Sequence, residues 1–282
     1  MRAEHYAHRH GVLVRAVLVA LVSLLATAGC AATTDGHGRV AAQCAPVFLG
    51  VPGSGQGVFN RAPGTVPAGV SAADAARFGS TVGRLKTELV AVAGKGLASA
   101  ASIDYPAIPV TDYIGIGGLT ADLGLSEAKG STKLVAAIRA ARRGQCAGRT
   151  VLLSGYSQGA EVVIRAVRRL TPAERAQVSV ALLGNPSYQP GQPGDFPGAS
   201  DAAGIRPAFT RGAFTLPADV RSRTIDVCAP GDPVCGVDPN LKFLDRISWV
   251  IGHAKIHENA YASGGQGLTK RAAQFLWQHR AG

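Results

Sequence analysis

Short apolar runs alternate with stretches of helical periodicity along most of the chain. Continuous apolar runs at 44–51, 150–154 and 178–183 predict strands that are buried on both faces. Shorter runs at 102–105 and 224–228 predict two further strands. Strands that alternate with helices indicate a parallel sheet covered on both sides. We therefore expect an α/β fold, a three-layer α/β/α sandwich around a central, mainly parallel sheet.

The predicted helices show apolar residues at the spacing of one buried face. Four segments have this pattern: 71–93, 131–143, 160–170 and 264–277. Ser71 and Ser131 are the expected N-caps of the first two helices. Basic residues near 143 followed by Gly144 predict the end of the second.

The N-terminus has the order of features of a secretory signal. Three arginines lie in the first 15 residues, an apolar stretch covers 17–26, and small residues precede Cys30. The small residues before Cys30 resemble a bacterial lipobox, whose cysteine is lipidated after cleavage, although Thr27 stands where leucine is usual. We expect residues 1–30 to be an export signal of the lipoprotein type, and simple cleavage without an anchor is the alternative.

The rest of the chain predicts a tether and one domain. Residues 31–43 are small and polar and are expected to form a flexible tether. Residues 44–282 suit one α/β domain, and no run after the N-terminus approaches the ~20 apolar residues of a membrane-spanning helix. The Gly- and Pro-rich stretch 185–217 is too long for an ordinary connection, so we expect a surface lobe or a flap over the site.

The cysteine count agrees with export. With Cys30 set aside, four cysteines remain, an even number in an oxidising compartment. Cys228 and Cys235 flank a short Pro/Gly loop and could close it, in which case Cys44 and Cys146 would pair. Four cysteines allow three pairings, and the sequence alone does not choose. No Cys-x-x-Cys motif or His cluster accompanies them, so we expect no metal site.

The basic charge does not predict nucleic-acid binding. The formal charge of the chain is +11, and residues 1–30 hold three Arg and one Glu, which leaves +9 on the remainder. The Lys and Arg residues are scattered, and no basic run alternates with aromatic residues. A solvated basic surface is the simpler interpretation, and attraction to anionic lipid or cell-wall polymer is the second.

The segment 155–159 reads Gly-Tyr-Ser-Gln-Gly, a nucleophile elbow between a predicted strand and a predicted helix. In such an elbow one tight turn places Ser157 in a strained conformation, and glycines two residues away avoid a collision. The hydroxyl of Ser157 is then exposed at the sheet edge. The backbone N–H of Gln158 points to where an oxyanion forms.

Three motifs in order resemble one known family. Gly-Tyr-Ser-Gln-Gly-Ala at 155–160, Cys-Ala-Pro-Gly-Asp-Pro-Val-Cys at 228–235 and the segment 257–275 are similar to the signatures of the cutinase-like serine esterases. These include fungal cutinases and the cutinase-like lipases and phospholipases of mycobacteria and related actinobacteria. The resemblance runs from Cys44 to the C-terminus and implies an α/β-hydrolase fold.

The base of a triad follows the serine in α/β-hydrolases. His253, His257 and His279 satisfy this order, and His279 is expected at the surface, near the end of the last helix. The resemblance implies His257. His257 lies four residues before Tyr261, where the family usually has three, so His253 stays open as the alternative.

The acid is expected between the serine and the histidine. The resemblance implies Asp232, which lies between two cysteines just after a predicted buried strand. A closed loop would hold it rigidly against the imidazole, whose tautomer must be fixed. Asp226 and Asp238 are the alternatives, and each could be an ordinary surface or capping residue.

A second oxyanion donor is expected in the Gly-rich turn at 52–57. Ser54 matches the position of the family's oxyanion Ser or Thr, so the resemblance implies that Ser54 and Gln158 together form the oxyanion hole. The alternative is an ordinary loop serine.

The sequence therefore predicts an exported or envelope-anchored serine esterase. We expect it to hydrolyse carboxylic esters of the lipid, phospholipid or polyester type through an acyl-enzyme, without metal or cofactor. The alternatives are an acyltransferase with the same triad and a catalytically silent envelope-binding protein. We expect a monomer that binds no nucleic acid and can associate with the membrane or cell wall.

Overall fold

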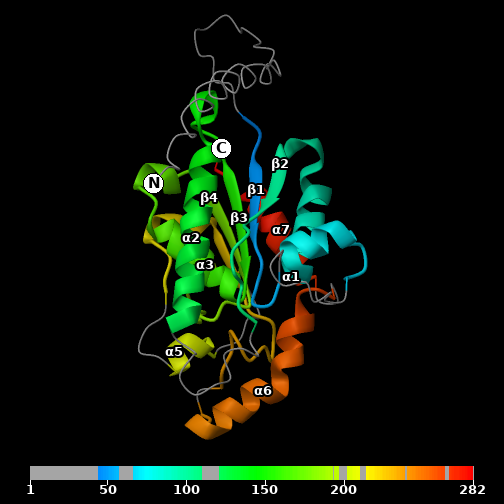
Figure 1. Cartoon of the computed structure of the whole chain (residues 1–282), viewed down its shortest axis with the longest axis vertical. Coiled ribbons are helices and arrows are strands. Elements are labelled where there is room, and N and C mark those ends of the chain that lie inside the picture. The colour runs from blue at the N-terminus through cyan, green and yellow to red at the C-terminus, as the bar shows by residue number, and fades with distance from the viewer. Residues whose placement is uncertain are drawn as a thin grey trace, which may run out of the picture. The chain divides into compact units, whose positions relative to one another are not determined.

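The computed structural model describes most of the chain after residue 43 (Figure 1). The described residues are 44–56, 66–109, 121–192, 194–196, 202–209, 214–238, 240–263 and 267–281. The predicted export signal with Cys30 and the predicted tether at 31–43 lie outside them.

The described residues form a five-stranded parallel sheet with the strand order β2-β1-β3-β4-β5. The strands are β1 (Val47–Val51), β2 (Ser99–Ser102), β3 (Val151–Tyr156), β4 (Val178–Leu183) and β5 (Thr224–Val227). Every residue of β1, β3 and β4 is buried, as their continuous apolar runs predict. Because all strands run in one direction, their carboxyl ends meet at one edge.

The edge strand β2 corrects the prediction at 102–105. It covers Ser99–Ser102, and its residues are only partly buried or exposed. The more apolar residues that follow leave the sheet, and Ile103 and Tyr105 are buried against the helix layer instead. An edge strand needs less apolar character than a central one, so the apolar run marked the wrong segment.

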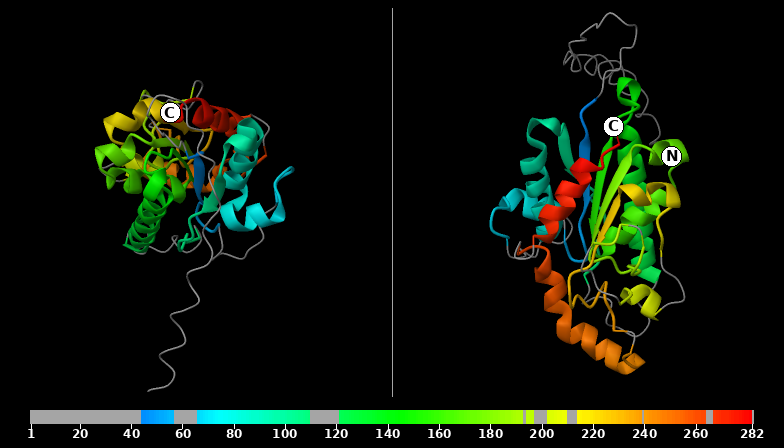
Figure 2. Two further views of the ribbon diagram at one scale, coloured as in Figure 1. Left: turned by 90° about the horizontal axis from the view of Figure 1, so that it is seen from above. Right: turned by 180° about the vertical axis from the view of Figure 1, so that it is seen from behind.

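Helices α1 (Ala72–Ala93) and α7 (Leu268–Gln278) cover one face of the sheet (Figure 2). Phe48 of β1 and Leu152 of β3 point into this layer. The predicted cap of α1 is confirmed, since the Ser71 hydroxyl accepts a hydrogen bond from Asp74 N at 3.0 Å. The helix is interrupted at Gly79, whose φ is +73°.

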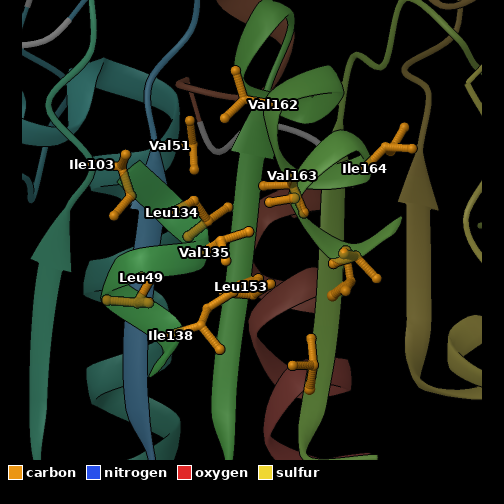
Figure 3. Packing of buried hydrophobic residues seen from close by; sticks show 14 of the residues in the cluster. Leu49, Val51, Ile103, Leu134, Val135, Ile138, Leu153, Val162, Val163 and Ile164 are labelled. Carbon is orange, nitrogen blue, oxygen red and sulfur yellow. The ribbon is translucent and has the colours of Figure 1, made fainter. Parts of the chain in front are cut away.

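Helices α2 (Ala121–Ala141) and α3 (Gln158–Arg168) cover the opposite face (Figure 3). Leu49 and Leu153 point into this layer, where they meet Leu134 and Val163 from the two helices. Neighbouring strand residues thus serve opposite layers, as the pleat requires. The two layers and the sheet make the predicted three-layer sandwich.

Two helix predictions need correction. Helix α2 begins ten residues before the predicted start, and Ser131 lies inside it, where its hydroxyl donates to Ala128 O rather than capping an N-terminus. Helix α6 (Phe243–Ala260) was not predicted at all. Short helices complete the described part: α4 (Pro172–Arg175), α5 (Ile205–Phe209), and 3-10 turns at Gly94–Gly96, Gly144–Cys146 and Ala218–Arg223.

The four cysteines left after Cys30 form two disulfides. Cys44 pairs with Cys146 and Cys228 pairs with Cys235, which selects one of the three pairings open to the sequence. The first bond joins the start of β1 to the segment before β3, and the second closes the short loop after β5. No described helix is long and apolar enough to cross a membrane.

The last described residues are bonded to the amino ends of two central strands. The Ser179 hydroxyl of β4 donates to His279 O at 2.8 Å, and the Thr150 hydroxyl, just before β3, donates to Ala281 O. The chain after α7 is therefore held at the edge of the sheet opposite to the carboxyl ends of the strands.

We predict that the long-range disulfide contributes more chain entropy than the short one. The paired cysteines are 102 residues apart in Cys44–Cys146 and 7 apart in Cys228–Cys235. Replacing Cys44 and Cys146 together by serine should lower the free energy of unfolding by about 4–5 kcal/mol, against about 2–3 kcal/mol from loop entropy for the short bridge. Urea titration of both double variants measures this, and a loss below about 1 kcal/mol for the long bridge would contradict it.

Candidate active site

The turn after β3 holds Ser157 in a strained conformation. Ser157 has φ +54° and ψ −122°, and it is the only non-glycine with a positive φ among the described residues. Its N–H donates to Leu183 O at 2.9 Å, which fixes the turn against the end of β4. Ser157 as a whole is buried, with 8% of its surface exposed.

The glycines on both sides of Ser157 are required by contacts. A Cβ on Gly155 would lie 2.3 Å from Gly159 O, and a Cβ on Gly159 would lie 2.3 Å from Val51 O. Helix α3 therefore starts directly against the end of β1. The predicted elbow is present in the backbone, for the steric reason that the sequence suggested.

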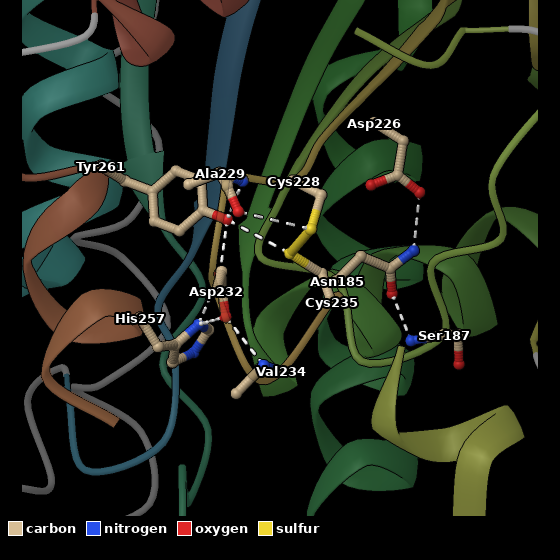
Figure 4. Close-up of a disulfide and its surroundings, with 10 residues drawn as sticks. All are labelled: Asn185, Ser187, Asp226, Cys228, Ala229, Asp232, Val234, Cys235, His257 and Tyr261. Atoms are coloured by element: carbon tan, nitrogen blue, oxygen red, sulfur yellow. Dashed lines mark hydrogen bonds and ion pairs between the residues drawn. A yellow bond between two sulfur atoms is a disulfide. The ribbon is translucent and has the colours of Figure 1, made fainter. Parts of the chain in front are cut away.

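Asp232 lies in the loop closed by Cys228–Cys235 and is fully buried (Figure 4). Its carboxylate accepts hydrogen bonds from Val234 N at 2.8 Å and from the Tyr261 hydroxyl at 2.5 Å. His257 Nδ1 lies 3.0 and 2.9 Å from its two oxygens. The structure therefore brings Asp232 and His257 together, as the sequence predicted.

The imidazole of His257 is held from several sides. His257 lies on the last turn of α6, and its ring stacks on Tyr156 with centroids 4.8 Å apart. The Tyr156 hydroxyl donates to His257 O at 2.8 Å. A Cβ on Gly184 would approach His257 Cε1 to 2.7 Å, so only glycine fits beside the ring.

The second ring nitrogen of His257, Nε2, has no hydrogen-bond partner among the described residues. Nε2 is buried, and no bond to Ser157 is formed in this structure. The two residues are nevertheless neighbours through shared contacts, because Ser157 follows Tyr156 and bonds to Leu183, next to Gly184. Catalytic hydrogen bonds are often long in a ligand-free enzyme and tighten when substrate binds.

The alternative bases lie elsewhere. His253 is one turn earlier on α6, where its Nδ1 lies 2.8 Å from Trp249 O. His279 is exposed, and its Nδ1 lies 3.1 Å from Phe275 O. Both nitrogens face the carbonyl four residues earlier in the chain, so each bond is local to a helix.

The alternative acids are also placed apart from the imidazole. Asp238 accepts from Asn240 N at 2.8 Å in a local turn. Asp226 points to the other face of β5 and accepts from Asn185 Nδ2 at 2.7 Å. Neither forms an ion pair with His257 among the described residues, where the partner of His257 is Asp232.

Ser54 and Gln158 lie side by side next to the nucleophile. The Ser54 hydroxyl donates to Gln158 Oε1 at 3.3 Å, and Gln158 Nε2 donates to Ser126 Oγ at 3.0 Å. Gln158 is the first residue of α3, where backbone N–H groups have no partner within the helix. The pair can therefore present a hydroxyl and unpaired N–H groups to a developing negative charge.

The electrostatics of the site favour an ionised Asp232. Burial alone would raise the pKa of Asp232, but the charge and hydrogen bond of His257, and the bonds from Tyr261 and Val234, bring its pKa below the usual value. Burial and the charge of Asp232 raise the pKa of Tyr261 and Tyr156 well above the ordinary value. Both phenols therefore stay neutral donors.

Two buried carboxylates, Glu127 and Glu161, anchor the long connection after β4. Arg206 of α5 donates to Glu161 of α3 and to Glu127 of α2. Burial and the charge of Glu161 raise the pKa of Glu127 to about 9, although Arg206 and Arg165 oppose the rise. Hydrogen bonds from Arg206 outweigh burial at Glu161 and lower its pKa. The described part of 185–217 is thus tied to α2 and α3.

Sequence reasoning missed the residues that support the site. Tyr156 carries the stacking contact, Gly184 makes room for the ring, and Ser126 holds the Gln158 amide. Tyr156 occupies a variable position of the elbow motif, and neither Gly184 nor Ser126 belongs to a local pattern. Their roles can be inferred only from the residues that they contact in the folded structure.

The cutinase family model matches residues 71–275. The carboxylesterase Culp1 of Mycobacterium tuberculosis is 32% identical over 131 residues, which are 46% of this chain and 47% of that protein. Cutinase CUT1 of Coprinopsis cinerea is 29% identical over 165 residues, 58% of this chain and 65% of that protein. The chain therefore spans between about half and just under two thirds of the length of these relatives.

Two solved structures share the fold. A cutinase-like protein from Cryptococcus sp. has a TM-score of 0.57 and 20% identity, with 84% of this chain and 96% of that chain covered. An acetylxylan esterase has a TM-score of 0.57 and 20% identity, with 85% and 100% covered. At this identity the likeness concerns the fold alone, and it confirms the predicted three-layer sandwich.

We predict that Asp232 makes the free energy of unfolding depend on pH in the acidic range. Because its pKa is lowered by folding, the ionised carboxylate stabilises the fold above the unfolded pKa, and this contribution is lost as the pH falls through the folded pKa. Asp232→Asn should cost about 1.5–3 kcal/mol at pH 7, and the cost should shrink on acidification. Urea unfolding from pH 7 to pH 2 measures it, with the exposed Asp104→Asn as control. A cost that is constant with pH would contradict the assignment.

Proposed function

Because the chain belongs to the cutinase family, we propose that it is a serine hydrolase of carboxylic esters. The observation that carries this proposal is the buried Asp232–His257 pair, which lies beside the strained Ser157 turn at the carboxyl edge of the sheet. In open α/β sheets this edge is where ligands bind. The order Ser, Asp, His along the chain is that of the α/β-hydrolases.

The proposed reaction begins with attack by Ser157. Its oxygen bonds to the ester carbonyl carbon while His257 Nε2 takes the hydroxyl proton. The carbonyl oxygen becomes an oxyanion, which the Gln158 and Ser54 N–H groups stabilise, and the Ser54 hydroxyl joins them by turning away from Gln158 Oε1. Collapse breaks the bond to the alcohol, which leaves with the proton from His257. Water then attacks the acyl-enzyme, again through His257, and releases the acid and free Ser157.

Asp232 and Tyr261 act through the imidazole. Asp232 holds the proton of His257 on Nδ1, which leaves Nε2 as the acceptor, and its charge stabilises the imidazolium that forms. The Tyr261 hydroxyl donates to Asp232 and accepts from Ala229 N at 3.0 Å, so it fixes the carboxylate. The proposed chemistry uses no metal and no cofactor.

The proposed setting is outside the cytoplasm. The N-terminal sequence pattern supports export, with lipidation at Cys30 as the anchor, and two disulfides suit an oxidising compartment. The proposed substrates are esters with lipid-like, phospholipid or polyester acyl chains. Trp249 and Val250 support apolar acyl chains, since they are partly buried apolar residues of the helix α6 that also carries His257.

Ser157→Ala should abolish turnover of p-nitrophenyl esters. The purified protein should hydrolyse esters of increasing chain length and should be labelled by a fluorophosphonate, which reacts with activated serines. The variant should lose both properties while its circular dichroism stays unchanged. Absence of turnover and labelling in the parent would favour the envelope-binding alternative, and an acylated alcohol formed with an added acceptor would indicate the acyltransferase.

His257→Gln and His253→Gln should differ in activity. Loss of the base in a triad costs about 10⁴–10⁶ in kcat, so we expect a fall of that order for His257→Gln. The hydrogen bond and the ring contact of His253 are both to Trp249 on its own helix, so His253→Gln should stay near the parent value. Ester hydrolysis by the two variants, on the same helix and one turn apart, measures the contrast. A larger loss for His253→Gln would reverse the assignment.

A further inference from the structure

A pocket of mixed polar and apolar lining lies on the opposite face of the sheet from His257. Leu182 and Phe214 are among its apolar lining residues, and its polar lining includes Asn185, Gln189, Gln192, Asp195, Thr224 and Asp226. Ile225 and Val227 of β5 point to the layer of α1 and α7, where Tyr156 stacks on His257. Asp226 alternates with them and so points to the other face, as Figure 4 shows across the disulfide. The pocket is therefore separate from the proposed active site.

Asp226 brings an uncompensated oxygen into this pocket. Its Oδ2 accepts from Asn185 Nδ2 at 2.7 Å, whereas its Oδ1 is buried and has no hydrogen-bond partner among the described residues. Burial raises the pKa of Asp226 to about 8, against the bond from Asn185, and the charge of Asp195 adds to the rise. A buried acceptor without a donor is costly, so the site favours a ligand that supplies positive charge.

Asp195 supplies a second free oxygen next to the first. Asp195 and Asp226 are partners in a parallel bridge, with Asp226 N donating to Gly194 O at 2.8 Å, so their side chains start about 5 Å apart. Asp195 Oδ2 accepts from Gln192 N at 2.9 Å, while its Oδ1 is buried and unpartnered among the described residues. Each carboxylate thus keeps one oxygen bonded and one free.

No described side chain forms an ion pair with Asp195 or Asp226, although Arg221 also lines the pocket. Two adjacent carboxylates cannot both ionise at low cost unless a cation or a proton lies between them. The lining also contains the amides of Gln189 and Gln192 and the hydroxyl of Thr224, which offer further oxygen ligands, beside apolar side chains that offer none.

We propose that Asp195 and Asp226 bind a hard divalent cation of the calcium type. Calcium takes six to eight oxygen ligands in flexible geometry, from carboxylates, amide carbonyls and water. No described group of three His, Cys, Asp or Glu side chains is placed to hold a metal, so a zinc-type site with its softer ligands does not fit. The cation would join β5 to the segment 194–196 and stabilise the connection after β4 without entering the reaction.

Terbium, which replaces calcium and luminesces when a nearby tyrosine is excited, is the probe. The Tyr188 hydroxyl bonds to Asp195, which places a sensitiser beside the site. The chelator-treated full chain should show saturable terbium luminescence that excess calcium abolishes. Calcium should also raise the melting temperature with the logarithm of its concentration.

Four variants decide the proposal. Asp226→Asn and Asp195→Asn should each weaken terbium binding at least about 10-fold, whereas the exposed Asp104→Asn should not. Tyr188→Phe should dim the luminescence but keep the melting shift. Circular dichroism checks that each variant folds. Unchanged terbium binding in both Asp226→Asn and Asp195→Asn would overturn the proposal. It would also be overturned if calcium does not raise the melting temperature of the parent and Asp226→Asn is as stable as the parent. In that case the two carboxylates share a proton instead of a cation. Ester hydrolysis should persist without calcium, so this result is independent of the proposed activity.

Discussion

The buried charge of Asp232 is the constraint around which the candidate site is organised. A carboxylate removed from water must be surrounded by donors, and those of Asp232 come from distant parts of the chain. Val234 belongs to the disulfide loop, His257 to the end of α6, and Tyr261 to the turn that follows. The same bonds that stabilise the charge therefore attach α6 and the C-terminal region to β5. The hydrogen bonds that stabilise the charge of Asp232 therefore also position the imidazole of His257.

The parallel sheet places the remaining groups at the same edge. Ser54 follows β1, Ser157 follows β3, Gly184 follows β4 and Asp232 follows β5. Segments far apart in sequence thus converge without any of them being close along the chain. The tight contact between Gly159 and Val51 O presses the start of α3 against β1, which brings Gln158 next to Ser54. Gly155 and Gly159 have no side chain, which allows this close contact and so fixes the positions of Gln158 and Ser54.

Local patterns predicted the central strands and the nucleophile turn well, because burial on both faces and a strained turn leave clear marks in the sequence. The edge strand at Ser99–Ser102 and the helix Phe243–Ala260 escaped for different reasons. The edge strand is too small and polar to stand out from a loop. The helix has apolar residues three and four apart, which is a helical signal, but Gly252 interrupts the pattern and weakens it. Tyr156 and Gly184 could not be inferred, since only their contact with the imidazole gives them a role.

The bonds from Ser179 and Thr150 to the residues after α7 have a practical consequence for handling the molecule. They hold residues 279–281 at the amino edge of the sheet, while Ser157 lies at the carboxyl edge. A linker attached after residue 281 would leave the domain on the side away from Ser157. Immobilisation or surface display through that point should orient the candidate site towards an insoluble film or particle rather than towards the support.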